Sequence, residues 1–582
     1  MTEIPLQDLS AFKPAAANWQ IAGDVRADLN QDENLVPAAG AGVLVNRPDP
    51  DHRDNLFSNL EHGDIDLELD VLMARHSNSG VYLQGRYEVQ LLDSWGKRYP
   101  AFSDIGGIYE RWDDNKPEGQ KGFQGIPPRL NAARAPGLWQ HLRIEFQAPR
   151  FDASGNKTAN ARFIRVVLNG VTIQENVEVT GPTRGAPFGR EATMGPIMLQ
   201  GDHGPVAFRH IRYREYVSQT VRIEQLKYRY FSGQHEYLPN FPSLKPDAAG
   251  DAEGLTWAYA KGDNDFALQF TGLLLVPDSG AYRFTLSSNA NSMLQIGGDT
   301  VIGEAWWTRS AVVQLKAGQT PIEITYCKAA EWLQPGLGLT VEGPHFRPIP
   351  LHVPSSLTVT NPVAPILIQP GNEPEILRSF IDIYPGGKRK RIVHAISVGH
   401  PEDLSYTLDL DNGALVQVWK GGFLDATPMW NDRGDGHANP VGSVLFLGDT
   451  PQVGPMTDVW PDTMAVADSF HLKGYYLDGG GAPAFEYSID NITVKDRLLP
   501  AGGGKWLERE LVFGDNKRVN NPAFRLAAGS EIVAVAADTW AVDGKRFYIQ
   551  LLSGQQPQVR NAGGYAELLL PAAGTIRYNL IW

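Results

Sequence analysis

Short runs in which apolar and polar residues alternate fill most of the chain, and runs with the spacing of an amphipathic helix are scarce. Alternation with a period of two is typical of a β-strand that has one face on a core. Gly and Pro, at 60 and 41 residues, fall between these runs at the spacing of turns rather than in repeats. Strands without crossover helices favour antiparallel sheets packed face to face, so the sequence predicts an all-β protein built of β-sandwiches.

One of these runs, VYLQGRYEVQL at residues 81–91, has an unusual polar face. Every odd position is apolar or Gly, which predicts a single half-buried strand whose other face is free. The even positions carry Tyr82, Gln84, Arg86, Glu88 and Gln90. A phenol, two amides, a guanidinium and a carboxylate are groups that bind sugar hydroxyls and transfer protons. We therefore interpret this face as the floor of a site.

Composition and charge narrow the classes of partner. The net charge of −14 over 582 residues argues against nucleic acid or an anionic membrane as the main partner. The single Cys327 excludes an internal disulfide and a cysteine-cluster metal site. No apolar run approaches the length of a membrane span.

The first residues, MTEIPLQDLSAFKPAAANWQIAG, have neither the basic region nor the apolar region of a signal peptide. Two interpretations stay open at this point. The protein is cytoplasmic, or the sequence is a mature periplasmic or secreted form whose leader has been removed.

Composition shifts and Pro-rich connectors divide the chain into three expected domains. One boundary is predicted after the strand that ends at Glu215-Tyr216, and another at the connector RPIPLHVPSS. The expected domains are residues 1–217, 218–352 and 353–582, and we expect each of them to be a β-sandwich. The last would be a large sandwich, with carbohydrate binding as one candidate role.

The first of these segments resembles the 3-keto-disaccharide hydrolase domain family over about residues 5–216. The resemblance implies a concanavalin-like, jelly-roll β-sandwich, and one local departure from the family pattern is QGDHGPV around His203. The segments that carry it are NSGVYLQGRYEVQLLDS (78–94), IGGIY (105–109), WQHLRIEFQAPRFDASGNKTANARFIRVVLNG (139–170), NVEVTGPTRGA (176–186) and GPIMLQGDHGPVAFRHIRYRE (195–215).

The family resemblance implies a substrate whose C3 hydroxyl has been oxidised to a ketone. Such a ketone acidifies the proton on C2, so a modest base can remove it and the enolate can expel the C1 substituent. This chemistry needs a base near C2, a donor at the enolate oxygen and an acid for the leaving group. Ordinary glycosidases instead use two carboxylates across an oxocarbenium-like transition state.

The candidate catalytic residues are Glu88 for proton transfer, His203 in the glycine-rich loop, and Arg209 at the enolate oxygen. Arg86, two residues from Glu88, is expected to lower the pKa of that carboxyl. The candidate substrate-binding residues are Tyr82, Gln84, Arg86, Gln90, Asp93, Tyr109 and Gln200.

Several candidates also have a structural interpretation, and Arg209 could instead pair with an acidic neighbour. Arg86 and Glu88 could form a surface ion pair, and His203 with Asp202 could belong to an ordinary turn. Asp93 could equally be a turn former, and Tyr109 a buried core tyrosine. The acidic positions Asp64, Asp66, Glu68 and Asp70 are expected to form a solvated face rather than a metal site, because their side chains diverge along the strand.

The second and third segments have weaker functional signals. GLLLVPDSGAYRFTLSSNANSMLQIGGDTVI (272–302) is similar to the lectin-like domain named after anthrax protective antigen, but Ser288-Asn289-Ala290-Asn291 replaces the Asp-Asp pair of its calcium-binding members. HAISVGHPEDLSYTLDLDNGALVQVWKGGFLDATPMWNDRGDG (394–436) is similar to a segment attached to bacterial sugar-dehydrogenase-like and cytochrome-like proteins. A candidate second sugar or ion site there comprises Asp425, Trp430, Asp432, Asp435 and His437.

The sequence thus predicts an enzyme that cleaves the glycosidic bond of 3-keto-glycosides or 3-keto-disaccharides by C2 deprotonation and β-elimination, as a net hydrolase or as a lyase. The alternative is a carbohydrate-binding or adhesion protein without catalysis. A keto-sugar substrate implies functional coupling to a sugar 3-dehydrogenase. No metal ligands are assigned, although a divalent ion such as calcium stays an open cofactor.

Overall fold

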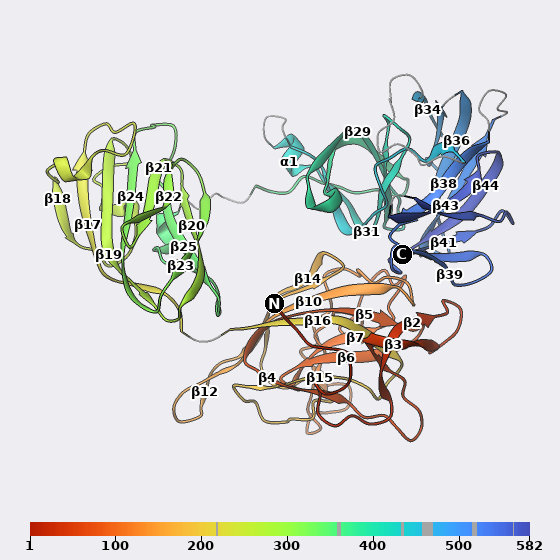
Figure 1. Cartoon of the computed structure of the whole chain (residues 1–582), viewed down its shortest axis with the longest axis horizontal. Coiled ribbons are helices and arrows are strands. Elements are labelled where there is room, and N and C mark those ends of the chain that lie inside the picture. Colours follow the sequence, from red (N-terminus) through yellow and green to blue (C-terminus); the bar gives the residue numbers. More distant parts are fainter. Residues whose placement is uncertain are drawn as a thin grey trace. The chain divides into compact units, whose positions relative to one another are not determined.

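In the computed structural model, strands make up almost all of the regular secondary structure (Figure 1), which confirms the all-β prediction. Residues Met1–Arg214 and Ala364–Trp582 form one compact unit, and Glu215–Val363 form a second. The only α-helix in the described part of the chain is α1, Thr427–Trp430. The structure describes residues 1–216, 219–357, 363–431, 436–456, 470–489, 491–514, 521–562 and 564–582.

The N-terminal segment is a sandwich of two antiparallel sheets. The larger sheet has the order β14-β13-β10-β5-β16-β3-β2, with β1 beside β16, and the smaller has the order β4-β15-β6-β7. The larger sheet comprises β1 (Thr2–Glu3), β2 (Trp19–Ala27), β3 (Leu35–Asn46), β5 (Asp64–Met73), β10 (Trp139–Gln147), β13 (Ala161–Leu168), β14 (Val171–Val179) and β16 (Val206–Tyr216). The smaller comprises β4 (Leu56–His62), β6 (Asn78–Leu83), β7 (Tyr87–Leu92) and β15 (Gly195–Leu199). Short pairs β8 (Arg111–Trp112) with β9 (Gly122–Phe123), and β11 (Arg150–Phe151) with β12 (Lys157–Ala159), lie in the loops.

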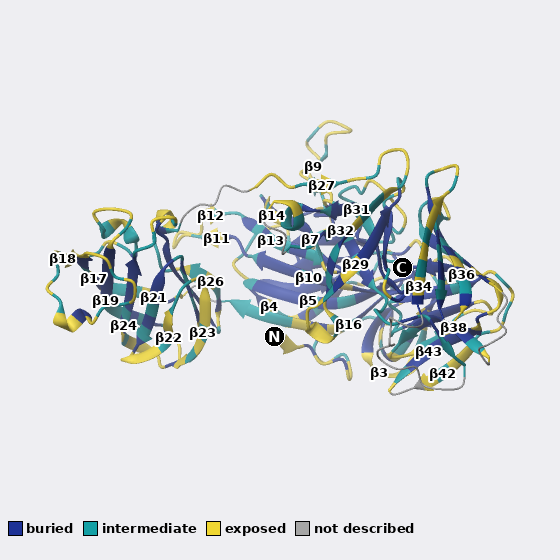
Figure 2. Cartoon of the chain, turned by 90° about the horizontal axis from the view of Figure 1, so that it is seen from above, coloured by how far each residue is buried: buried dark blue, intermediate teal, exposed yellow. Residues whose placement is uncertain are grey.

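Alternating apolar side chains from both sheets fill the core of this sandwich. Leu67, Leu69 and Val71 of β5 and Val81 and Val89 of β6 and β7 belong to one buried cluster. Figure 2 shows β5 and β10 mostly in the colour of buried residues. The odd positions of the 81–91 run therefore face the core, as the alternation predicted.

The prediction of one continuous strand over residues 81–91 is wrong. The chain reverses at Gln84-Gly85, both of which have positive φ, and Arg86 N donates to Leu83 O at 3.0 Å to close the turn. The three-residue connection joins the paired residues Leu83 and Tyr87. Because this number is odd, the alternation continues across the turn, and a hairpin has the same sequence pattern as a strand.

The unit of residues 215–363 is also a two-sheet sandwich. Its sheets have the orders β18-β17-β19-β24-β21-β22 and β23-β20-β25-β26. The first comprises β17 (Arg222–Ser232), β18 (Ala248–Asp251), β19 (Phe266–Val276), β21 (Asn291–Ile296), β22 (Asp299–Ala305) and β24 (Gly318–Lys328). The second comprises β20 (Gly280–Ser288), β23 (Arg309–Leu315), β25 (Leu337–Gly343) and β26 (Phe346–Pro350). Their apolar faces share one buried cluster.

The described residues of the C-terminal segment form three sheets, of which the largest has the order β34-β35-β36-β37-β44-β41-β40-β39. Its strands are β34 (Phe470–Leu477), β35 (Pro483–Ile489), β36 (Ile492–Ala501), β37 (Trp506–Phe513), β39 (Ile532–Ala534), β40 (Thr539–Val542), β41 (Phe547–Leu551) and β44 (Gly574–Ile581). A second sheet contains β33 (Val453–Pro455), β38 (Pro522–Gly529), β42 (Gln558–Ala562) and β43 (Tyr565–Pro571). The third contains β27 (Leu367–Ile368), β28 (Glu375–Ile383), β29 (Lys390–Gly399), β30 (Leu404–Asp409), β31 (Leu415–Asp425) and β32 (Asn439–Phe446).

Within their common unit, the N-terminal and C-terminal segments meet through aromatic contacts. The rings of Trp95 and Trp506 stack at a centroid distance of 5.9 Å, and Trp95 Nε1 donates to Trp582 O at 3.0 Å. Tyr548 donates its hydroxyl to Pro136 O at 3.1 Å. We refer to this contact as the sandwich junction.

Candidate functional site

The candidate site lies on the hairpin β6–β7, where Tyr82 is paired with Glu88. Both backbone groups of Glu88 are used by loops rather than by β6: its N–H donates to Thr183 Oγ1 at 3.2 Å, and its carbonyl accepts from Tyr109 N at 3.2 Å. Tyr82 and Glu88 are therefore a non-hydrogen-bonded pair, in which opposed side chains approach most closely.

Loops cover this polar face, which the sequence predicts to be free. The side chains of Tyr82, Glu88 and Gln90 are buried, with Glu88 only 1% exposed. The backbone of Gly106 and Gly107 is hydrogen-bonded to Gln90 on one side of the hairpin. The prediction of a free face is wrong because the covering loops come from distant parts of the sequence.

Gly80 provides the space that the Glu88 carboxylate occupies. It is paired with Gln90, two pairs along the hairpin from Tyr82 and Glu88 and therefore on the same face. A Cβ built on Gly80 would overlap Glu88 Oε1 and press on the rest of the carboxyl group. Any side chain at this position would therefore displace the carboxylate.

Burial raises the pKa of Glu88 to about 8, and the negative charge of Asp202 adds to the rise, whereas hydrogen bonding with Tyr82 opposes it. Oε2 has no hydrogen-bond partner among the described residues. The carboxyl is thus largely protonated at neutral pH and becomes a strong base when it ionises. Burial and the neighbouring Glu88 charge also raise the pKa of the Tyr82 phenol.

The expected effect of Arg86 on Glu88 is wrong. Arg86 lies in the turn, where its Nε donates to Arg190 O at 2.7 Å and its Nη1 donates to Gln84 O at 2.7 Å. Its guanidinium lies 5.0 Å from the ring centre of Phe188. Arg86 is therefore not among the charges that shift the pKa of Glu88, and burial dominates instead.

Gln84 and Gln90 have local hydrogen-bond partners. Gln84 Nε2 donates to His62 O at 3.0 Å and to Thr193 O at 2.9 Å, which holds the turn against neighbouring segments. Gln90 Nε2 donates to Asn78 Oδ1 at 2.8 Å on the same face as Glu88. Of these two amides, only that of Gln90 lies on the same face of the hairpin as Glu88.

Asp202 and His203 form a pair beside this face. His203 Nδ1 lies 2.6 Å from Asp202 Oδ1, and the imidazole is about half exposed. The hydrogen bond that His203 makes to Asp202 raises the pKa of His203. The charge of Asp202 raises the pKa of both Glu88 and Tyr82. The loop that carries Asp202 and His203 therefore contributes to the electrostatics of the hairpin face.

Gln200 and Tyr109 complete the group that the structure brings together. Gln200 N donates to Gly80 O at 2.9 Å, one residue beyond the β15–β6 pair Leu199 and Val81. This register places Gln200 on the Gly80 side of the hairpin. Burial raises the pKa of Tyr109, and the charge of Glu88 contributes to the rise.

Trp112 and Arg184, which were not predicted from the sequence, lie at the edge of this group. Tyr82 donates its hydroxyl to Arg184 O at 3.2 Å, and the Arg184 guanidinium lies 3.7 Å from the centre of the Trp112 ring. Arg184 also pairs with Glu110 at 3.1 Å, and the indole of Trp112 is 36% exposed. An exposed indole three residues after Tyr109 was the available signal. Its contact with Arg184 depends on the fold.

Arg209 and Asp93 lie away from Glu88. Arg209 is on β16 of the larger sheet, where its Nε donates to Asp70 Oδ2 at 3.1 Å and its guanidinium stacks over Trp139. Asp93 accepts from His76 N at 3.0 Å at the end of β7 and lines a cavity at the sandwich junction. The structure thus brings neither residue to the hairpin face.

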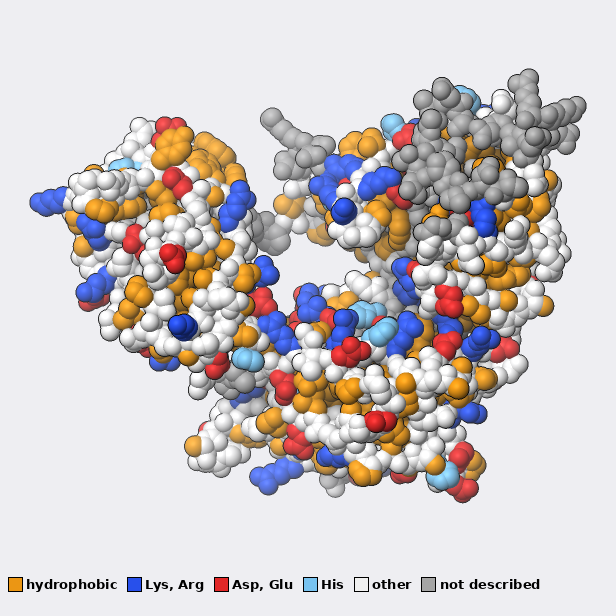
Figure 3. All heavy atoms as spheres, viewed as in Figure 1, with side chains coloured by type: hydrophobic (Ala, Val, Ile, Leu, Met, Phe, Trp, Pro, Cys, Tyr) orange, Lys and Arg blue, Asp and Glu red, His pale blue; other side chains and the backbone are white. Residues whose placement is uncertain are grey.

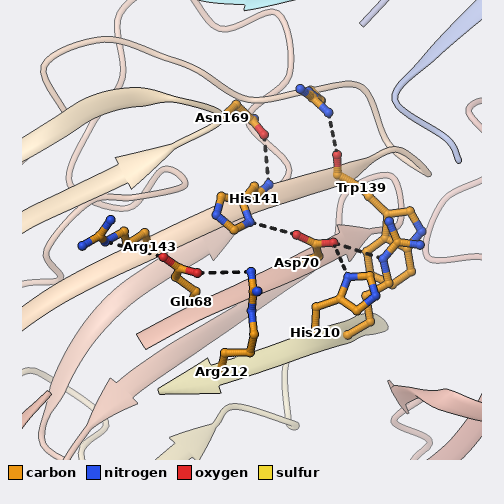
Figure 4. A network of polar contacts seen from close by, with 10 residues as sticks. Glu68, Asp70, Trp139, His141, Arg143, Asn169, His210 and Arg212 are labelled. Atoms are coloured by element: carbon orange, nitrogen blue, oxygen red, sulfur yellow. Dashed lines mark hydrogen bonds and ion pairs between the residues drawn. The ribbon is translucent and has the colours of Figure 1, made fainter. Parts of the chain in front are cut away.

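The acidic positions of β5 belong to a network of ion pairs on the outer face of the larger sheet, and Figure 4 shows Glu68 and Asp70 within it. The prediction of a merely solvated face is therefore wrong. Figure 3 shows acidic, basic and His side chains close together on the surface of the N-terminal segment. Asp70 accepts from His141 and His210, both at 3.0 Å, as well as from Arg209. Glu68 pairs with Arg212 at 3.2 Å. Burial would raise the pKa of Asp70, but these partners outweigh it and lower the pKa to about 2.

Among the described residues, no group of three or more His, Cys, Asp or Glu side chains is placed to hold a metal ion. Of the candidate C-terminal cluster, Asp432 and Asp435 lie outside the described residues. Asp425 accepts from Thr427 N at 2.8 Å, and His437 pairs with Asp382 at 3.1 Å. Trp430 is exposed.

Comparison with known families assigns two parts of the chain. Residues 7–214 match the model of the 3-keto-alpha-glucoside-1,2-lyase-like domain, and residues 230–346 match that of the PA14 domain. The chain therefore carries a carbohydrate-active domain followed by a lectin-like domain of the protective-antigen type, which confirms both resemblances. No helix of the described residues is long and apolar enough to cross a membrane.

Solved structures from Parabacteroides distasonis, each described as a "putative glycosyl hydrolase", are similar to part of the chain. One has 25% identity and a TM-score of 0.23, covering 36% of this chain and 84% of its own. Another has 20% identity and a TM-score of 0.25, covering 37% and 100%. At such TM-scores these structures support no comparison of sites, so the assignment rests on the family models. No curated protein matches the chain.

Proposed function

We propose that the N-terminal domain cleaves the glycosidic bond of 3-keto-glycosides by β-elimination, followed by hydration or release of the unsaturated sugar. The observation that carries this proposal is the buried Glu88 carboxyl, with its pKa raised to about 8, in a domain of the 3-keto-glucoside lyase-like family. A base of this strength suits removal of a proton from carbon beside a ketone.

The proposed elimination divides proton transfer between Glu88 and His203. The ionised Glu88 carboxylate takes the C2 proton, and the electron pair of the broken bond forms an enolate with the C3 carbonyl. As the enolate collapses to a C1–C2 double bond, the C1–O bond breaks and the leaving oxygen takes a proton from the His203 imidazolium. The products are an unsaturated keto-sugar and the released alcohol.

Hydration would convert this elimination into net hydrolysis. Water adds its oxygen to C1, Glu88 returns its proton to C2, and His203 regains a proton from the water. Tyr82 and Tyr109 are the phenols placed to donate hydrogen bonds near Glu88, and Trp112 over Arg184 is an aromatic surface suited to a sugar ring or aglycone.

The proposed substrate requires a preceding oxidation. A C3 ketone arises by removal of two electrons from the C3 hydroxyl, so we propose that a sugar 3-dehydrogenase supplies the substrate. We also propose a periplasmic or secreted location, which fractionation of cells that produce the full-length precursor would test.

Release of 4-nitrophenol from 4-nitrophenyl 3-keto-β-glucoside and from the unoxidised glucoside tests the proposal. We expect release from the keto form alone, reduced by roughly 10²- to 10⁴-fold in Glu88→Gln. Glu68→Gln on the outer face is the matched control and should retain activity. Cleavage of the unoxidised glucoside, or full activity in Glu88→Gln, would refute the mechanism. The mass of the sugar product separates hydration from simple release, because the unsaturated keto-sugar is lighter than the hydrated one by one water.

A lectin-like function is the second candidate, favoured by the PA14 match over residues 230–346. On this alternative the chain binds sugars without cleaving them. Binding of the keto-glucoside without any release of nitrophenol would select it.

A further inference from the structure

A polar cavity of about 350 Å³ lies at the sandwich junction, within the unit formed by the N-terminal and C-terminal segments. Its walls come from both segments, since Asp93 and Trp95 belong to one and Trp506 and Gln550 to the other. This volume is in the range of small-molecule sites. The cavity is separate from the Glu88 group, which contributes none of its lining residues.

Two stacked indoles form the aromatic part of the wall. Trp95 and Trp506 lie nearly parallel, with 16° between their planes, and each is only partly buried. Trp95 is fixed by its hydrogen bond to Trp582 O at 3.0 Å. The two rings cover one face of each other, so a sugar ring would pack on the parts of the indoles that remain exposed to the cavity.

The indole N–H of Trp506 is a second, independent observation that indicates a ligand in this cavity. Its Nε1 is buried and has no hydrogen-bond acceptor among the described residues. Buried donors are almost always paired with protein, water or a ligand, so such a donor in a cavity wall calls for an acceptor. A sugar hydroxyl or ring oxygen would supply that acceptor.

The charges around the cavity select the kind of ligand. Asp93 contributes a carboxylate whose pKa is raised by burial, and Lys505 contributes an ammonium group that lies 5.4 Å from the centre of the Trp95 ring. Gln550 and Asn30 contribute amides. Arg75 and His76 also line the cavity, but both lie against Asp32, at 3.1 and 3.2 Å, so Asp93 would still repel an anion. Acceptors and donors side by side suit a neutral ligand rich in hydroxyl groups.

The approach of Lys505 depends on a glycine. A Cβ built on Gly96 would lie 2.6 Å from Lys505 Cγ, and Gly96 has a φ of 77°. The absence of a side chain at Gly96 therefore lets the Lys505 stem pack against the N-terminal segment. The cavity wall is thus closely fitted across the junction rather than a loose gap between two domains.

We propose that the cavity at the sandwich junction is a second carbohydrate-binding site, which takes a neutral mono- or disaccharide against Trp95 and Trp506 with Asp93 and Gln550 as hydroxyl partners. The site does not depend on the proposed cleavage at Glu88. It gives the C-terminal segment a direct role in holding sugar beside the matched domain.

Fluorine NMR of the full chain labelled with 5-fluorotryptophan tests this proposal, with maltose, cellobiose and glucuronate as probes. The Trp95 and Trp506 resonances are assigned from Trp95→Phe and Trp506→Phe. We expect both resonances to shift with maltose or cellobiose, with a dissociation constant on the order of millimolar. Glucuronate should bind at least fivefold more weakly because of Asp93.

Variants separate the cavity from the Glu88 group. Asp93→Asn and Gln550→Ala should each weaken the neutral-sugar response at least fivefold, whereas Glu88→Gln should leave it unchanged. If Trp506→Phe does not fold, Gln550→Ala still decides the outcome. Resonances that do not move at 100-fold the expected dissociation constant, or shifts that Asp93→Asn and Gln550→Ala leave intact, would overturn the proposal.

Discussion

The two faces of the N-terminal sandwich shift the pKa values of their carboxylates in opposite directions. On the hairpin face, Glu88 is buried beside another acid, and its pKa rises to about 8. On the outer face of the larger sheet, Asp70 is held by two imidazoles and a guanidinium, and its pKa falls to about 2. Both carboxylates lie on strands of one domain.

This difference in pKa indicates that Asp70 contributes to the stability of the fold, whereas Glu88 is suited to catalysis. The partners of Asp70 favour its ionised form, so its charge stabilises the fold. Glu88 lacks such compensation, and its burial destabilises the ionised form that a base requires. An energetic cost of this kind persists at sites where it serves a function, which makes the hairpin face the better candidate for catalysis.

Filling the space that the Glu88 carboxylate occupies should have the largest effect on activity. We expect Gly80→Ala to displace the carboxylate and to lower kcat/KM for the keto-glucoside about 100-fold, because small displacements of reacting groups are costly. Gly63→Ala is the control, since a Cβ there meets only Thr193 O, at 3.5 Å. Steady-state assays at matched thermal stability measure the effect. Unchanged kinetics in Gly80→Ala would remove Glu88 from the mechanism.

Asp70→Asn should have its effect on stability rather than on activity. The folded pKa of Asp70, about 2, lies below its unfolded value of 3.8, so its contribution is present above pH 4 and is lost as the pH falls towards 2. We expect a loss of about 1–2 kcal/mol at pH 7, after allowance for solvent screening. Urea denaturation at pH 7 and at pH 3 measures the loss, which should shrink at the lower pH. A constant difference would contradict this assignment.

The pH profile should move in opposite directions when the two neighbours of Glu88 are changed. Tyr82 lowers the pKa of Glu88 and Asp202 raises it, so Tyr82→Phe should shift the ascending limb of kcat/KM to higher pH and Asp202→Asn to lower pH. We expect shifts of up to about one pH unit. Profiles recorded from pH 5 to 10 provide the test, and shifts of the same sign would exclude Glu88 as the titrating base.

Trp112→Ala should have the smallest effect. Loss of the aromatic surface above Arg184 should raise KM about three- to tenfold for an aryl keto-glucoside while kcat changes little, because stacking contributes about 1 kcal/mol. Trp332→Ala, a more exposed tryptophan of the PA14-matching segment, is the control. A fall in kcat without a change in KM would place Trp112 in the chemistry rather than in binding.

Much of the hairpin face could be predicted from the sequence. The odd positions face the core and Tyr82, Glu88 and Gln90 share the other face, as the alternation predicted. The reversal was not predictable from this pattern because a three-residue connection preserves alternation. Gln84 is also an unusual residue for positive φ, so the local turn signal was weak.

The electrostatics of the site could not be predicted from local spacing. Arg86 is two residues from Glu88, but the turn directs it to Arg190 O. The loops that bury Glu88 are fixed by contacts far apart in sequence, such as Glu88 N to Thr183 Oγ1. Arg209 was misplaced because His210, with a φ of 50°, disturbs the alternation of β16.

The sandwich junction also constrains how this protein is made. Trp95 and its partner Trp506 are 411 positions apart, so at roughly 5–20 residues per second the ribosome needs about 20–80 s to supply the partner. During that interval the apolar surface around Trp95 and Leu138 has no cover from the C-terminal segment. Nascent chains therefore expose an apolar patch, and a chain whose synthesis stops before Trp506 is expected to aggregate. Residues 506–582 therefore protect the N-terminal segment from aggregation once they have been synthesised and have packed against it.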